Sequence, residues 1–117
     1  MAGVMRKSEI QSRILVALCA GFVGRSLFMR INSGKVRTED GRWIQLAPSG
    51  TADILGTVDG RSVAIECKAA RGAQRKTQKT WQAAFERAGG VYVISRDAET
   101  VCGDLRKALD ISICHIA

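Results

Sequence analysis

The chain has 117 residues, 46% of them hydrophobic, and its 18 Lys and Arg against 11 Asp and Glu give a formal net charge of +7. This length fits one domain with a modest core, expected over residues 1–117, and the hydrophobic share excludes a disordered tail. A basic protein attracts polyanions, most commonly nucleic acid, so an acidic or purely structural role is disfavoured. A single His and the lack of a CxxC pair argue against a zinc-built fold.

The first part of the chain predicts a helix followed by short strands. The helix is expected to begin at Ser8, which forms a capping box with Gln11, and to end at Gly21. Its apolar side chains recur at helical spacing, as Ile10, Ile14 and Leu18. Short strands are expected over residues 27–31 and 42–46, with turn-rich segments around them.

Two further strands are predicted over residues 52–58 and 61–68. They are joined by Asp59-Gly60, the strongest short signal of a β-hairpin. If these two residues form the whole loop, Asp53 stands directly opposite Glu66, and their side chains share one face of the sheet. A one-residue bulge would break this register, so the pairing depends on a tight turn.

The rest of the chain predicts a helix, a strand and a second helix. We expect the helices over residues 74–88, ended by Gly89-Gly90, and over residues 97–109, capped by the aspartate at its start. A buried strand lies between them at 91–95, and the weak alternation over 111–116 predicts an edge strand. This order of elements predicts one α/β domain with a mixed sheet.

Asp53 and Glu66 are expected to repel each other, which costs stability unless a cation binds. Lys68 lies on their face by the strand period of two and relieves part of the repulsion, whereas Cys67 points to the opposite face. Carboxylate oxygens with a backbone carbonyl and water suit Mg²⁺ or Mn²⁺. The alternative is a surface strand with ordinary charges; the apolar neighbours of Glu66 argue against it, because they predict a buried acid.

The spacing of Asp53 and Glu66-Cys67-Lys68 resembles the D…ExK signature of the PD-(D/E)xK nuclease superfamily. The neighbouring sequence resembles its VRR-NUC branch, the virus-type replication-repair nucleases, in the short stand-alone form of phages and prophages. The resemblance runs over residues 9–99 and is carried by the segments RINSG (30–34), PSGTADILG (48–56), AIECK (64–68), QKTW (78–81) and AGGVYV (88–93). The chain departs from the family pattern before the aspartate, where Thr51-Ala52 replaces a bulkier residue and the proline is displaced to Pro48.

The resemblance implies a single PD-(D/E)xK nuclease core of α-β-β-β-α-β type, a mixed central sheet flanked by helices. It implies a structure-selective DNA endonuclease that uses Mg²⁺ or Mn²⁺ and nicks branched DNA, such as Holliday junctions, as a homodimer. Two symmetric nicks also require two sites related by a two-fold axis. The interface is expected at the edge strand 111–116 or on the apolar face of the first helix.

The resemblance also assigns roles. Asp53, Glu66 and the backbone carbonyl of Cys67 would bind the metal, and Lys68 would hold or activate the attacking water. Gln78 places a polar amide on the apolar stripe of the second predicted helix, where it would assist that water or Lys68.

Two of the candidate site residues have plain structural alternatives. Gln78 could be a satisfied core glutamine. Glu9 is a candidate ligand for a second metal, and the alternative is that its charge favours the dipole of the first helix.

The basic residues are unevenly distributed. The charge balance is +6 over residues 1–37, −3 over 38–60, +5 over 61–87 and −1 over 88–117, so an acidic block lies between two basic stretches. The residues expected to bind DNA phosphates are Arg30, Lys35, Arg37, Arg71, Arg75, Lys76 and Lys79. The alternative is an ordinary solvated face. Both tryptophans, Trp43 and Trp81, are expected in the core rather than as base-stacking platforms.

Other function classes remain open at this point. They are a non-catalytic DNA-binding module on a nuclease scaffold, a flap- or end-processing nuclease, and a restriction-type nuclease, for which 117 residues leave little room for base readout. The four cysteines lack short spacing and are expected to be reduced, the alternative being a secreted disulfide protein.

The apolar run 14–23 resembles a signal peptide, but Arg25 interrupts it. We therefore expect no membrane partner and a cytoplasmic location, in the bacterial host of a phage or prophage gene.

Overall fold

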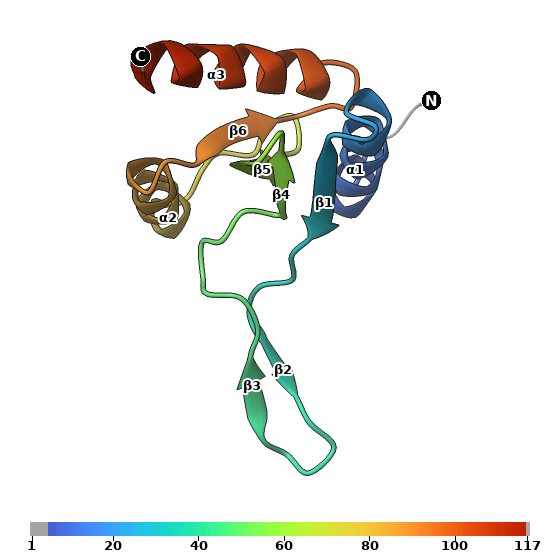
Figure 1. The fold of residues 1–117 in the computed structure, drawn as a ribbon. Helices are drawn as coiled ribbons and strands as arrows, with labels where there is room; N and C mark the ends of the chain where they lie inside the picture. Colours follow the sequence, from blue (N-terminus) through green and yellow to red (C-terminus); the bar gives the residue numbers. More distant parts are fainter. Residues whose placement is uncertain (1–4, 117) are drawn as a thin grey trace.

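The computed structural model describes residues 5–116, and the side chains of residues 5–110. Within this range the protein has a central four-stranded mixed sheet in the order β1-β4-β5-β6 (Figure 1). The strands of this sheet are β1 (Ser26–Arg30), β4 (Ile54–Val58), β5 (Arg61–Cys67) and β6 (Val91–Ser95), and the helices are α1 (Lys7–Gly21), α2 (Lys76–Arg87) and α3 (Val101–Ile116). β1, β4 and β5 pair antiparallel and β6 pairs parallel to β5. The predicted mixed α/β class is confirmed.

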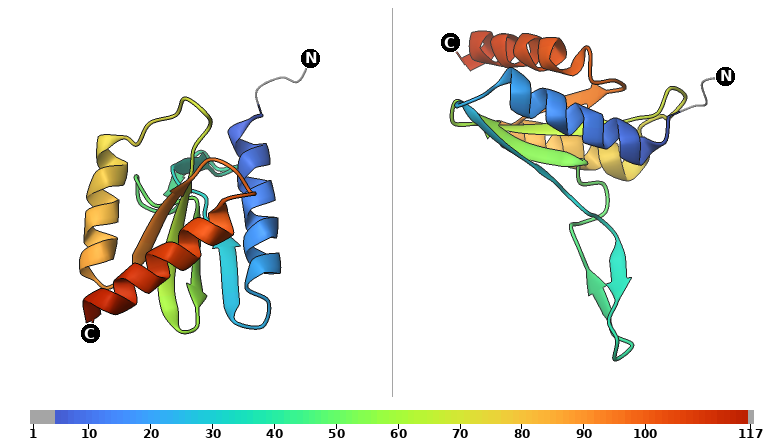
Figure 2. Two further views of the ribbon diagram at one scale, coloured as in Figure 1. Left: turned by 90° about the horizontal axis from the view of Figure 1, so that it is seen from above. Right: turned by 90° about the vertical axis from the view of Figure 1, so that its right-hand side faces the viewer.

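The helices cover the two faces of the sheet unequally. α1 and α3 lie on one face, where the main core forms (Figures 1 and 2). The predicted apolar stripe of α1 is fully used in that core, so this stripe is not free to form a dimer interface, which corrects one of the two expected locations. α2 lies on the other face, where Trp81 and Phe85 stack at 4.9 Å between ring centres and pack over Ala64 and Tyr92. The half of this second face at β1 is left uncovered, with Leu27 and Met29 exposed.

The hairpin between β4 and β5 forms as the sequence predicts. Asp59 and Gly60 are the two loop residues, with φ of 49° and 81°, the left-handed values of a type I′ turn. Val58 pairs with Arg61, and the register continues without a bulge to Ile54 and Ile65. One position further out are Asp53 and Glu66. The turn thus sets which two acids meet.

Three helix boundaries differ from the predictions. α1 begins at Lys7, because the carbonyl of Arg6 already accepts a hydrogen bond from Ile10 N at 3.1 Å; the capping box at Ser8 is therefore wrong. α2 begins at Lys76, two residues later than expected. α3 begins at Val101, since Asp97 accepts from Thr100 N at 2.9 Å in a turn that precedes the helix.

The predicted edge strand at 111–116 is also wrong, because α3 runs on to Ile116. The helical spacing of Val101, Leu105 and Leu109 continues into this segment, and no Gly or Pro after Gly103 ends it. The second expected dimer interface was this segment, and it is helical instead of an edge strand. Among the described helices, none combines the length and apolar character needed to span a membrane.

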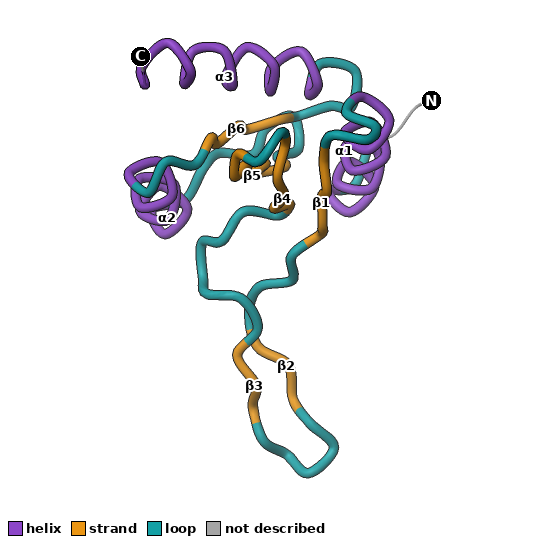
Figure 3. Tube along the Cα trace, in the orientation of Figure 1, coloured by secondary structure: helices purple, strands orange, loops and turns teal. Residues whose placement is uncertain are grey.

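A two-stranded arm projects from the body over residues 31–47 (Figures 1 and 3). It contains β2 (Lys35–Arg37) and β3 (Trp43–Gln45), which pair antiparallel with each other in a separate sheet. The sequence predicted β3 but missed β2. Trp43 was expected in the core, yet 63% of its surface is exposed, because its strand packs outside the main sheet.

Gly56 in β4 provides a test of the β1–β4 packing. A Cβ there would lie 2.3 Å from the carbonyl oxygen of Leu27 and 2.7 Å from the ring of Phe28. We expect Gly56→Ala to lower the free energy of unfolding by about 1–3 kcal/mol through overpacking, measured by urea denaturation. The matched control is Gly103→Ala in α3, where a Cβ has free space within 4 Å; helix propensity should make it neutral or stabilising by up to about 1 kcal/mol. Equal destabilisation by both changes would contradict the β1–β4 packing.

Candidate metal and catalytic site

Four predicted site residues meet at one end of the sheet. Asp53 precedes β4, Glu66 and Lys68 lie at the end of β5, and Gln78 lies in the first turn of α2. Asp53 and Glu66, hereafter the acid pair, are adjacent because of the hairpin register, and α2 brings Gln78 over them. Residues 25 positions apart in sequence thus form one polar cluster at the junction of two strands and a helix.

Glu66 is the centre of the cluster and is fully buried, with 0% of its surface exposed. Its Oε2 accepts a hydrogen bond from Gln78 Nε2 at 2.7 Å and lies 3.3 Å from Lys68 Nζ. Its Oε1 is buried and has no hydrogen-bond partner among the described residues. A buried carboxylate oxygen normally has a partner, so Oε1 is the atom of the cluster whose hydrogen bonding the described residues leave unaccounted for.

Gln78 holds Lys68 and Glu66 in place. Its Oε1 accepts from Lys68 Nζ at 2.7 Å and from the backbone N–H of Arg75 at 2.8 Å, while its Nε2 donates to Glu66. The bond to Arg75 is the capping box of α2, so the helix start fixes the orientation of the amide. Gln78 therefore contacts both Lys68 and Glu66, and it is also buried and fully hydrogen-bonded, as the structural alternative states.

Asp53 is held from the opposite strand. Its Oδ2 accepts from the backbone N–H of Cys67 at 2.8 Å, and 16% of its side chain remains exposed. Lys7 in the first turn of α1 also contacts the acid pair, with Nζ 3.4 Å from Asp53 Oδ2 and 3.8 Å from Glu66 Oε2. The sequence analysis missed Lys7, because no local pattern places the start of α1 against the end of β5.

Glu9 and Cys67 are placed differently. Glu9 is exposed in the first turn of α1, and no group of three Asp, Glu, His or Cys side chains able to hold a metal occurs in the described part of the chain. The role of Glu9 as a ligand for a second metal stays a prediction. The Cys67 side chain points into the core on the other face, as predicted, and burial raises the pKa of its thiol to about 12. The Cys67 thiol therefore lies away from the acid pair, and its backbone N–H contacts Asp53.

The pKa of Glu66 is raised, chiefly because burial disfavours its charge and secondly because Asp53 repels it; Lys7 and Lys68 oppose this. Folding therefore favours the neutral acid. The contribution of this carboxyl to stability is full below its ordinary pKa of 4.5 and is lost as the pH rises through the raised value.

Measured from pH 4 to pH 8, the free energy of unfolding of Glu66→Gln relative to the wild type should increase above the ordinary pKa of 4.5 and level off above the raised pKa of Glu66. Each unit of raised pKa contributes about 1.4 kcal/mol to this difference. Urea denaturation in EDTA across this range would measure it. A difference that does not change with pH would show that the carboxyl is not forced toward its neutral form.

The residues expected to bind DNA are exposed on two sides of the acid pair. One group lies in the loop after β5 and the first turns of α2, as Arg71, Arg75, Lys76 and Lys79. The other group follows the end of β1 and the arm, as Arg30, Lys35 and Arg37. The first group follows Lys68 along the chain and Arg30 ends β1, whereas Lys35 and Arg37 lie on β2, in the arm that projects from the body (Figure 1).

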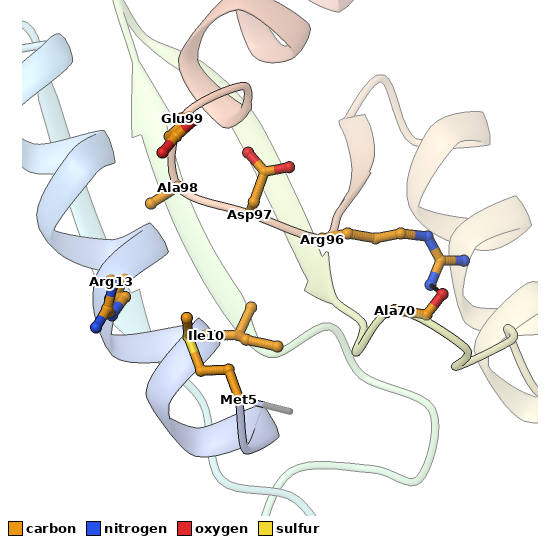
Figure 4. A pocket seen from close by; sticks show the side chains of 8 residues that line it. All are labelled: Met5, Ile10, Arg13, Ala70, Arg96, Asp97, Ala98 and Glu99. Atoms are coloured by element: carbon orange, nitrogen blue, oxygen red, sulfur yellow. Dashed lines mark hydrogen bonds between the residues drawn. The ribbon is translucent and has the colours of Figure 1, made fainter. Parts of the chain in front are cut away.

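A separate pocket lies between the start of α1 and the loop after β6 (Figure 4). Met5, Ile10 and Ala98 give it an apolar wall, and the Arg96 side chain at its rim donates to the carbonyl of Ala70. Asp97 lines it as well, but its carboxylate caps the turn before α3. The four site residues do not line this pocket, so it is distinct from the acid pair.

Comparison of the chain with known protein families gives no match, and comparison with curated proteins gives none either.

Proposed function

We propose that this protein is a metal-dependent, structure-selective DNA endonuclease of the VRR-NUC branch. The observation that carries the proposal is Glu66: a fully buried carboxylate beside a second carboxylate, with one oxygen lacking a partner among the described residues. Such a group is costly in a fold and is typical of sites that bind a cation. The order helix, three antiparallel strands, helix and parallel strand supports a PD-(D/E)xK core of α-β-β-β-α-β type.

The residues of the site fit Mg²⁺ or Mn²⁺. Both ions prefer oxygen ligands and keep several waters, so two carboxylates and the Cys67 carbonyl are a sufficient protein contribution. The contact of the Lys7 ammonium with both acids indicates that a cationic group can lie against the pair. When bound, the metal would polarise a phosphate and lower the pKa of a water molecule.

The chain's own residues would perform the remaining tasks. Lys68 places a positive charge beside Glu66, where it would hold the attacking water and offset the charge that develops on the phosphate. Gln78 orients Lys68 through its 2.7 Å hydrogen bond. The basic groups on either side would bind the flanking phosphates, which makes DNA binding strongly salt-dependent.

The proposed substrate is branched DNA, and the proposed active form is a homodimer. Cutting a four-way junction symmetrically requires two sites related by a two-fold axis, which a C2 dimer supplies. Light scattering at micromolar concentration tests this part, and a monomer would contradict the symmetric resolution of junctions.

A panel of end-labelled DNAs tests the function. Junction, flap, splayed, duplex and single-stranded DNAs would each be incubated with Mg²⁺, Mn²⁺ or EDTA. The proposal predicts metal-dependent nicking of the junction. Preference for flaps or ends would indicate a processing nuclease, cleavage of a duplex at one sequence would indicate a restriction-type enzyme, and binding without cleavage would indicate a non-catalytic module.

A further inference from the structure

The arm begins beside the acid pair. Its first residue, Ile31, donates its backbone N–H to the carbonyl of Asp53 at 2.8 Å. From there the arm extends away from the face that carries α3 (Figure 2). At about 3.3 Å per residue, its strands and loop reach roughly 25 Å from this point. A molecule bound at the acid pair therefore lies within reach of the arm.

The side chains of the arm divide into two faces according to its register. Val36 and Ile44 are directly opposite each other on one face, and Arg37 and Trp43 are opposite each other on the other face. The Arg37 guanidinium lies over the Trp43 ring, 5.7 Å from its centre. Lys35 shares this face by the strand period of two. The arm thus presents an exposed indole with Arg37 over its ring and a second cation, Lys35, two residues further along the same face.

The charges of this face are available to a ligand. At the tip of the arm, Asp40 is occupied by Arg42, with Nε 2.9 Å from Oδ2. Neither Lys35 nor Arg37 makes an ion pair within residues 5–110. Two copies of such a face would repel each other, whereas a polyanion would be attracted to both cations. Charge complementarity therefore favours nucleic acid over a second copy of the chain as the occupant.

The exposed Trp43 side chain indicates which part of the nucleic acid is bound. An indole stacks on the flat surface of a base, which is accessible where bases are unpaired and hidden inside a regular duplex. Trp43 is exposed on an arm that forms a sheet separate from the main one, so its indole is accessible to a bound partner. Lys35 and Arg37, on the same face of the arm, would bind the neighbouring phosphates.

We infer that the arm recognises unpaired nucleotides at a DNA branch, with Trp43 stacking on a base and Lys35 and Arg37 binding adjacent phosphates. This inference rests on the proposed function, because it names the element that selects the substrate of the same site. It differs from the expectation that neither tryptophan is a base-stacking platform. It also gives a physical basis for structure selectivity, since a continuous duplex offers Trp43 no free base.

The experiment measures DNA affinity and tryptophan fluorescence in EDTA, where cleavage cannot occur. We expect Trp43→Ala to weaken binding of splayed and junction DNA about 5- to 150-fold and to leave continuous duplex nearly unaffected, while Trp43→Phe keeps most of the affinity. Ile44→Ala, on the opposite face of the arm, is the matched control and should bind like the wild type. In Trp81→Phe, which leaves Trp43 as the sole tryptophan, single-stranded DNA should quench the fluorescence.

The outcomes separate this inference from the proposed function. The inference is overturned if wild type and Trp43→Ala bind branched DNA with equal affinity. It is also overturned if Trp43→Ala converts a dimer to a monomer while the DNA affinity per chain stays unchanged. If the wild type binds none of these DNAs, both proposals fail. If Trp43 contributes to binding but the wild type cuts no DNA with metal present, the role of the arm stands and the nuclease proposal fails.

Discussion

Replacing Asp53 by Asn should abolish Mn²⁺ binding and lower metal-dependent DNA cleavage on the order of a thousandfold, since the loss of one metal ligand removes several kcal/mol of charge stabilisation. The fold should persist, because an Asn Oδ1 can still accept the 2.8 Å hydrogen bond from the Cys67 N–H. Calorimetric titration with Mn²⁺ measures the first effect, and single-turnover cleavage of a labelled junction measures the second.

The control for Asp53→Asn makes the same charge change elsewhere. Asp104 is exposed in the first turn of α3, on an element that packs on the opposite face of the sheet, so Asp104→Asn should leave Mn²⁺ affinity and cleavage as in the wild type. If Asp53→Asn binds Mn²⁺ as the wild type does, the Asp53 carboxylate is not a metal ligand. Equal losses in both variants would show a general effect of charge instead of a local one.

Lys68→Met should separate chemistry from metal binding. Methionine keeps the apolar stem of the buried side chain but removes the ammonium that lies 3.3 Å from Glu66 and hydrogen-bonds to Gln78. We expect Mn²⁺ binding to remain and the single-turnover rate to fall about 10²- to 10³-fold, the usual cost of removing one group that stabilises developing charge.

Lys79→Met is the matched control for Lys68→Met. Lys79 is exposed on α2, so its loss should weaken DNA binding modestly and reduce the salt dependence, with little change in the rate at saturating protein. A Lys68→Met protein that cleaves at the wild-type rate would remove Lys68 from the chemistry. A rate lost equally in both variants would indicate that only the overall positive charge matters.

The acid pair could be predicted from sequence because a single local signal determines it. Asp59-Gly60 fixes a two-residue turn, and the strand period of two then carries the register outward to Asp53 and Glu66. Gln78 could be found because a polar residue interrupted an apolar stripe. The turn residues and the regular spacing of strand and helix were enough to predict the positions of these residues.

Lys7, β2 and the exposed Trp43 could not be predicted, for different physical reasons. The contact of Lys7 with the acid pair depends on how α1 packs against the sheet, which no short pattern encodes. β2 is only three residues long and all three are exposed, so its alternation is too short to predict a strand. Trp43 has a large apolar side chain of the kind usually found in a core. It is exposed because β3 belongs to a sheet separate from the main one, which the sequence does not show.

The acid pair lowers the stability of the metal-free protein. Burial and the charge of Asp53 both raise the pKa of Glu66, so the ionised Glu66 destabilises the fold at neutral pH. Buried groups of this kind cluster at functional sites, where a ligand compensates them. The stability of the wild type should therefore increase when Mn²⁺ is added.

The most direct test of the account is anomalous diffraction from crystals of the wild-type protein soaked in Mn²⁺. The account predicts a manganese peak in contact with the carboxylates of Asp53 and Glu66, and the loss of this peak in crystals of Asp53→Asn soaked identically. Wild-type crystals with no peak at the acid pair, from protein that still cleaves DNA with Mn²⁺, would contradict it.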